Sequence, residues 1–111
     1  MTDYKILAQS APDAGVDQSI YQVPPGKSVI IRSINITNTS QGSDKYDIAY
    51  TDGLVVPPVT PQPQDYINFN NTILAEETIT NKSGYTLSEN NSIVVKSSFG
   101  NTTFQVFGAE I

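Results

Sequence analysis

Hydrophobic residues alternate with polar residues in short runs along this chain, and turn-forming residues separate the runs. A period of two is typical of strands that bury one face, whereas helical periodicity is nearly absent. The pattern predicts an all-β fold, a two-sheet antiparallel β-sandwich with no substantial helix. The predicted strands are Tyr4–Gln9, Ser19–Val23, Ser28–Asn38, Lys45–Thr51, Asp65–Phe69, Ile73–Thr80, Tyr85–Leu87, Ser92–Ser97 and Thr102–Ala109.

The predicted strand Ser28–Asn38 has hydrophobic residues on both faces near its start, where Arg32 interrupts the pattern. Strict alternation places Ile30, Ile34 and Ile36 on one face. Hydrophobic residues on both faces indicate either a central strand or a bulge at this point.

Turn-forming residues separate the predicted strands in the rest of the chain. Pro24-Pro25-Gly26-Lys27 predicts a chain reversal, because proline presets φ and glycine accepts a positive φ. Phe99-Gly100-Asn101 predicts a C-terminal hairpin between the last two strands, which contribute four residues to the core: Ile93, Val95, Phe104 and Val106. The proline-rich segment 56–63 predicts an extended connection between sheets.

Length and composition narrow the possible functions. At 111 residues, the chain predicts one domain, residues 1–111. It contains no Cys and no His, which removes thiol chemistry and the usual general base. The six cations are scattered through a chain of net charge −5, so nucleic-acid binding is not expected. No apolar run approaches the ~20 residues of a membrane span. The apolar piece near the N-terminus is shorter than that of a secretory signal, so we expect an intracellular product without membrane contact.

The acidic residues offer two candidate centres, and neither fits a known chemistry. Asp44, Asp47 and Asp52 do not have the spacing of a helix-flanked calcium loop, so we expect a solvated strand face. Glu76 and Glu77 would point to opposite sides of a strand and could not act together. The sequence therefore predicts no catalytic residue, no metal site, no cofactor and no enzyme activity.

Six Tyr and four Phe leave one alternative open, since aromatic rings beside acidic and amide groups suit sugar recognition. A carbohydrate-binding β-sandwich module, acting in attachment to a host surface, is that alternative.

The run Tyr21–Ser40, YQVPPGKSVIIRSINITNTS, resembles the opening of small structural proteins of tailed bacteriophage virions. Two later pieces extend the resemblance: Gly84-Tyr85-Thr86-Leu87 followed by Ile93-Val94-Val95, and the ending Phe107-Gly108-Ala109-Glu110-Ile111. The family usually has Gly-Asp where this chain has Asn90-Asn91. The similarity spans residues 21–111. It implies an immunoglobulin-like or jelly-roll-like sandwich that forms part of the particle.

The resemblance implies a non-catalytic virion component, made in the host cytoplasm, that acts through protein–protein contacts. It could be a capsid decoration protein or a tail, neck or baseplate protein. The expected partners are the major capsid protein or tail and neck proteins, together with further copies of the chain in a homo-oligomer. We expect the contacts in an N-terminal arm, residues 1–17, and in the proline-rich connection, residues 55–64. The predicted contact residues are Tyr4, Ile6, Pro12, Pro57, Pro58, Pro61, Pro63 and Tyr66.

Overall fold

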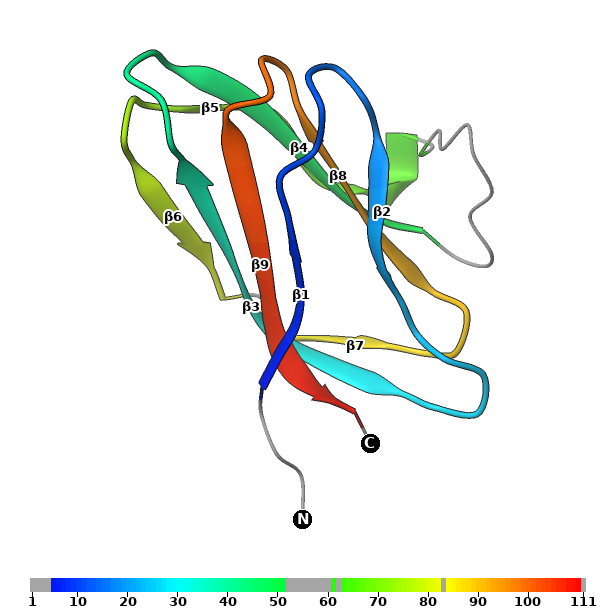
Figure 1. Ribbon diagram of the computed structural model, residues 1–111. Helices are drawn as coiled ribbons and strands as arrows, with labels where there is room; N and C mark the ends of the chain where they lie inside the picture. Colours follow the sequence, from blue (N-terminus) through cyan, green and yellow to red (C-terminus); the bar gives the residue numbers. More distant parts are fainter. Residues whose placement is uncertain (1–4, 52–60, 62, 83, 111) are drawn as a thin grey trace.

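Two antiparallel sheets pack face to face in the computed structural model, which describes residues 5–51, 61, 63–82 and 84–110 (Figure 1). Sheet A has the order β1 (Lys5–Ser10), β9 (Thr102–Glu110), β3 (Val29–Asn38) and β6 (Thr78–Asn81), with β7 (Tyr85–Leu87) also paired to β3. Sheet B has the order β2 (Gln18–Gln22), β8 (Ser92–Ser97), β4 (Asp44–Thr51) and β5 (Tyr66–Ile73). The predicted two-sheet β-sandwich is confirmed, and within the described ranges the one helical element is the 3-10 turn η1 (Pro63–Asp65).

The chain crosses between the sheets at most of its connections. In an immunoglobulin sandwich the first two strands share a sheet, but here β1 lies in sheet A and β2 in sheet B. The facing orders β1-β9-β3-β6 and β2-β8-β4-β5 are those of a jelly roll, in which the chain wraps around the core. Of the two expected topologies, the fold is therefore the jelly-roll-like one.

The connection between β8 and β9 also crosses the sandwich, so the predicted C-terminal hairpin is wrong. Strand β8 pairs with β2 and β4, whereas β9 pairs with β1 and β3. Alternation shows which face of a strand is buried and does not show to which sheet the strand belongs. The four side chains expected in the core from these strands are all buried, because their faces were predicted correctly: Ile93, Val95, Phe104 and Val106.

Strand β3 is both central and bulged. It pairs with β9 on one side and with β6 and β7 on the other, and its register to β9 shifts between Ile31 and Ser33. The extra residue, Arg32, reverses the alternation, so Ile31 is buried before the bulge and Ile34 after it. The prediction that Ile30 shares a face with Ile34 is therefore wrong.

A tight turn divides the predicted strand Ile73–Thr80. Strand β5 ends at Ile73, and Glu77 donates its backbone N–H to the Leu74 carbonyl at 3.1 Å. Glu76 has a φ of 58°, which is incompatible with a continuous strand. The turn carries the chain from sheet B to sheet A, so Glu76 and Glu77 do not lie in a strand as predicted.

Aliphatic residues from both sheets fill the space between them. Phe104 of β9 is fully buried, and its ring meets the edge of Tyr46 from β4 at a centroid distance of 6.3 Å. Burying each large side chain contributes about 1.5 to 3 kcal/mol. The buried core consists of Val23, Val29, Ile31, Ile34, Ile36, Tyr46, Ile48, Ile73, Leu87, Ile93, Val95, Phe104 and Val106.

Part of the predicted N-terminal arm belongs to the sandwich. Residues Lys5–Ser10 form β1, the edge strand of sheet A, and pair with β9 from Gly108 back to Phe104. Further along, Ala14 forms an isolated bridge to Ser97 of sheet B. In this structure residues 5–10 therefore add a strand to their own sheet and do not leave it.

Candidate functional site

Three of the predicted contact residues meet at one surface hollow. Pro61, Pro63 and Tyr66 line a hollow of about 390 Å³ together with Phe69, which the sequence did not single out. Pro61 is itself buried, whereas the Phe69 ring is 63 % exposed. The hollow lies where the chain enters β5 at the edge of sheet B. We call it the Tyr66 hollow.

Irregular pairing brings the two aromatic rings of this hollow together. Residues three apart in a regular strand point to opposite faces, but the register of β5 against β4 shifts twice between Tyr46 and Ala49. Asn70 has a φ of 53°, and its backbone N–H donates to the Asp47 carboxylate at 2.6 Å. As a result, the rings of Tyr66 and Phe69 pack edge to face at 4.8 Å.

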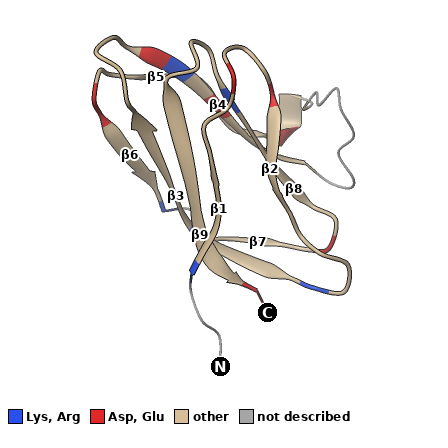
Figure 2. Cartoon of the chain, viewed as in Figure 1, with Lys and Arg blue, Asp and Glu red and all other residues tan. Residues whose placement is uncertain are grey.

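Three carboxylates lie close enough to Tyr66 for their charges to act on its hydroxyl group. Burial raises the pKa of Tyr66, and the negative charges of Asp17, Asp47 and Asp65 raise it further. Figure 2 shows the charged positions scattered over the fold, with an acidic one at the start of β2. The phenol therefore stays protonated and can donate a hydrogen bond. An apolar hollow beside negative charge suits a partner that presents an apolar side chain next to a cation.

The other predicted contact residues do not join this hollow. Ile6 is 51 % exposed on the edge strand β1, in sheet A. Pro12 is buried and lines none of the hollows described here, so its role as a contact residue stays a prediction. Tyr4, Pro57 and Pro58 lie outside the described residues.

Asp44 is the most extensively hydrogen-bonded carboxylate in the described part of the chain. Only 1 % exposed, it accepts hydrogen bonds from the Ser97 and Thr102 hydroxyls at 2.6 and 2.7 Å. Its other donors are the backbone N–H groups of Lys45, Phe99 and Asn101. The expected solvated acidic face is therefore wrong for Asp44, and also for Asp47, which is 8 % exposed; Asp52 lies outside the described residues.

The charge of Asp44 is maintained by these donors. Burial raises the pKa of its carboxyl, but the hydrogen bonds from Ser97, Thr102, Phe99 and Lys45 outweigh burial and hold the pKa below 3.8. Asp44 thus ties the start of β4 to the crossing between β8 and β9.

Asn38 has a similar role one strand away. Its amide nitrogen donates to the backbone carbonyls of Gly42, Ile73 and Leu74, and its amide oxygen accepts from Ser40. The buried amide therefore holds the β3–β4 loop against the β5–β6 turn. No sequence signal marked Asn38, because a polar residue at the end of an alternating strand is expected to be exposed.

The loops held by Asp44 and Asn38 expose hydrophobic residues. We call loops 11–17, 39–43, 74–77 and 98–101 the Asp44 end of the sandwich; backbone hydrogen bonds such as Thr39 N–H to Asn101 O at 2.9 Å join them. Leu74 is 60 % exposed there and Phe99 63 %. This end therefore exposes two large apolar side chains on loops that hydrogen bonds join.

The described ranges contain neither a candidate metal centre nor a candidate membrane-spanning helix. Within them, no group of three or more His, Cys, Asp or Glu side chains could hold a metal ion. No helix in the same ranges is long and apolar enough to span a membrane. Protein-family models and curated proteins were both compared with the chain, and neither comparison finds a match.

Proposed function

We propose that this protein is a non-catalytic structural component of a tailed bacteriophage virion, attached to other virion proteins by surface contacts. The resemblance of residues 21–111 to small virion proteins supports the proposal. The jelly-roll topology also supports it by analogy of fold, since jelly rolls recur in viral capsid domains.

The observation that carries the proposal is the aromatic pair at the Tyr66 hollow, in which Tyr66 is half-buried and Phe69 is exposed. Protein interfaces are enriched in aromatic side chains, which bury large areas at low entropic cost. Phe69 projects from a strand that is paired to β4, so little ordering is needed when a partner covers it. We propose this hollow as the main contact with a neighbouring virion protein.

Many symmetric copies would make modest contacts sufficient. After one contact of an assembled ring or lattice forms, the next ones form at a high effective concentration. The expected homo-oligomer and the contact with the major capsid protein or a tail or neck protein are parts of the same proposal.

Incorporation of variants into purified particles tests the proposed contact. We expect Phe69→Ser to lower the occupancy of the chain in particles about tenfold, because truncation removes a central aromatic contact. Phe99→Ser is the matched control, since its ring is equally exposed at the other surface. Full occupancy of Phe69→Ser, or a larger loss for Phe99→Ser, would show that the Tyr66 hollow is not the contact.

A further inference from the structure

The outer face of sheet A carries rows of uncharged polar side chains. The strand registers align one row across β1, β9, β3 and β6, and a second row across β9, β3 and β6. Every member of both rows is an amide or a hydroxyl. The first row is Gln9, Gln105, Asn35 and Thr80, and the second is Thr103, Thr37 and Thr78. We call these seven residues the amide face.

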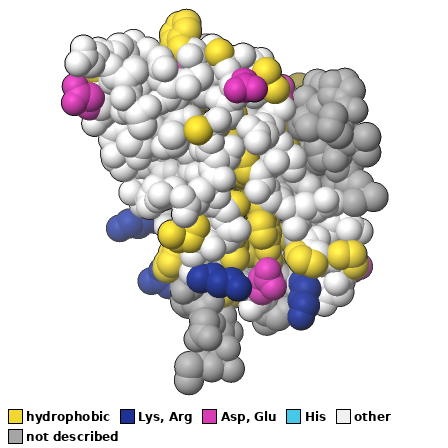
Figure 3. Space-filling model, in the orientation of Figure 1, with side chains coloured by type: hydrophobic (Ala, Val, Ile, Leu, Met, Phe, Trp, Pro, Cys, Tyr) yellow, Lys and Arg dark blue, Asp and Glu magenta, His cyan; other side chains and the backbone are white. Residues whose placement is uncertain are grey.

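Charged side chains lie around the amide face and not within it. Figure 3 shows much of this side of the molecule in white, the colour of uncharged polar side chains and backbone, with hydrophobic side chains mainly in the lower part and charged side chains towards the borders. Arg32 and Lys82 line a separate hollow beside Phe107, at the lower border of the face. A ligand seated on the two rows would therefore meet no formal charge.

Hydrogen bonds between neighbouring strands hold part of the face in place. The Thr80 hydroxyl donates to the Asn35 amide oxygen at 3.0 Å, and the Thr37 and Thr78 hydroxyls lie 3.2 Å apart. A surface fixed in this way loses little side-chain entropy when a ligand binds.

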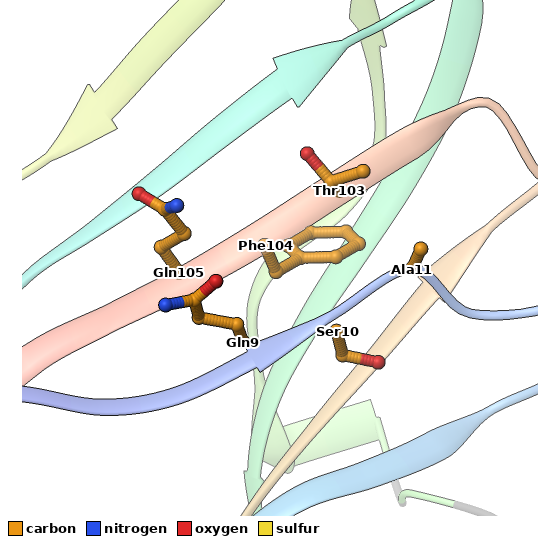
Figure 4. A pocket seen from close by; sticks show the side chains of 6 residues that line it. All are labelled: Gln9, Ser10, Ala11, Thr103, Phe104 and Gln105. Carbon is orange, nitrogen blue, oxygen red and sulfur yellow. The ribbon is translucent and has the colours of Figure 1, made fainter.

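A hollow opens beside the two glutamines. Its volume is about 360 Å³, and Gln9 and Gln105 line it together with residues at the end of β1 and the start of β9. Gln9 and Gln105 are directly paired, and Figure 4 shows their amide groups next to each other. Each amide offers two donors and one acceptor oxygen, so the pair can hold adjacent hydroxyl groups.

The chemistry of the face selects the class of ligand. None of the seven residues is aromatic or aliphatic, so the face lacks the apolar centre on which protein interfaces depend. It also lacks the cations that phosphate binding requires. Neutral amides and hydroxyls match a ligand that is itself neutral and rich in hydroxyl groups. We propose that the amide face binds a neutral polysaccharide, with Gln9 and Gln105 as the main contacts.

This site differs from the Tyr66 hollow in place and in chemistry. It lies in the other sheet, and it uses hydrogen bonds in place of aromatic packing. Polysaccharide binding at this face does not require the proposed virion role. The purified 111-residue chain is enough to test it.

Affinity electrophoresis of the full chain provides the test. The gels contain one neutral polysaccharide each, namely a β-glucan, a mannan, a galactan or a dextran, and one further gel contains anionic alginate. We expect retardation by at least one neutral polymer and none by alginate. The double variant Gln9→Ala/Gln105→Ala should bind the retarding polymer about tenfold more weakly, since two amides lose their hydrogen bonds.

Two further variants show where binding occurs. Gln22→Ala/Gln41→Ala removes two exposed amides elsewhere and should bind like the wild type. Thr103→Val keeps the β-branched shape in β9 while removing one hydroxyl, so a severalfold loss would confirm the face without disturbing the strand. Circular dichroism establishes that each variant is folded. No retardation by any neutral polymer, retardation by alginate alone, or equal losses in the two double variants would overturn the proposal.

Discussion

The two ends of the sandwich are fixed in different ways. At the Asp44 end, the buried side chains of Asp44 and Asn38 hold the loops, and each makes several hydrogen bonds. At the opposite end, which we call the Gly26 end, backbone hydrogen bonds join Val23 to Asn90 and Asn91, and the side-chain links are exposed. Glu89 accepts from the Gly26 backbone N–H at 2.7 Å, and Tyr21 donates to Glu110 at 3.2 Å.

This difference shows that hydrogen bonds of similar length contribute unequally to the free energy of unfolding. A buried donor that loses its acceptor cannot turn to water, whereas an exposed donor can. We therefore expect the Asp44 end to be the more rigid of the two and to depend strongly on two residues. The Gly26 end should tolerate substitution, because proline and glycine preset its turn, in which Gly26 has a φ of 77°.

The largest predicted effect is that of Asp44→Ala. The substitution leaves two buried hydroxyls and three backbone N–H groups without their acceptor, and it should lower the free energy of unfolding by about 4 kcal/mol. Urea denaturation monitored by circular dichroism measures this loss. If Asp44→Ala does not fold, Asp44→Asn, which keeps the shape and one acceptor, should lose about 2 kcal/mol. A loss under about 1 kcal/mol in both variants would mean that Asp44 does not fix this end.

Asn38→Ala should have the next largest effect. It removes the amide that joins two loops, leaves carbonyls of Ile73 and Leu74 unsatisfied, and should cost about 2 to 3 kcal/mol. Asn101 is a suitable control position, because its side chain is only half-buried and its backbone makes the loop contacts. Equal losses for Asn38→Ala and Asn101→Ala would contradict the role of Asn38.

Acid should weaken the Asp44 end, because the carboxylate of Asp44 is hydrogen-bonded in its charged form. The folded pKa of Asp44 lies below its unfolded value of 3.8, so the unfolded chain binds the proton more tightly. The stability that Asp44 contributes is complete above that value and is lost as the pH falls through the folded pKa. Asp17, whose pKa burial raises, acts in the opposite sense.

Unfolding free energies measured from about pH 5 down to about pH 2.5 test this dependence. The wild type should lose more stability across the interval than Asp44→Asn, in which the titrating group is absent. Parallel curves for the two proteins would show that Asp44 titrates alike in the folded and unfolded chains.

The smallest predicted effect is that of Glu89→Gln at the Gly26 end. The amide can still accept from the Gly26 N–H, and the group is exposed, so we expect a loss of less than about 1 kcal/mol. Thermal unfolding of the variant beside Asp44→Asn compares the two ends directly. A larger loss for Glu89→Gln than for Asp44→Asn would reverse the comparison.

Local patterns in the sequence predicted most of the strands, because alternation reports burial one residue at a time, but they missed that β5 continues to Ile73 and that a turn follows it. The reversal at Gly26 was predicted for a similar reason, since proline and glycine act on their own backbone. The face predicted for Ile30 was wrong, because the bulge at Arg32 arises from pairing with β9 and has no local signal in the sequence. The predicted hairpin between β8 and β9 was wrong, because the connection depends on the sheet to which each strand belongs.

The candidate sites were harder to predict, because they depend on residues distant in sequence. The proline-rich segment indicated Pro61 and Pro63, and Tyr66 was predicted beside it, but Phe69 joined them only through irregular pairing with β4. Asp44 is buried because its donors arrive from the β8–β9 crossing, more than fifty positions away. The amide face required the register of four strands, although alternation already placed Gln105 opposite the core residues Phe104 and Val106.

The number of copies of this chain in each purified phage particle tests the proposed role most directly. Quantitative mass spectrometry of particles from cells that carry the gene measures this number against the major capsid protein. The proposal predicts a fixed number, in the hundreds for a capsid component or a small multiple of three or six for a tail component. A chain that is absent from the particles, or present in amounts that vary with purification, would contradict the proposed role.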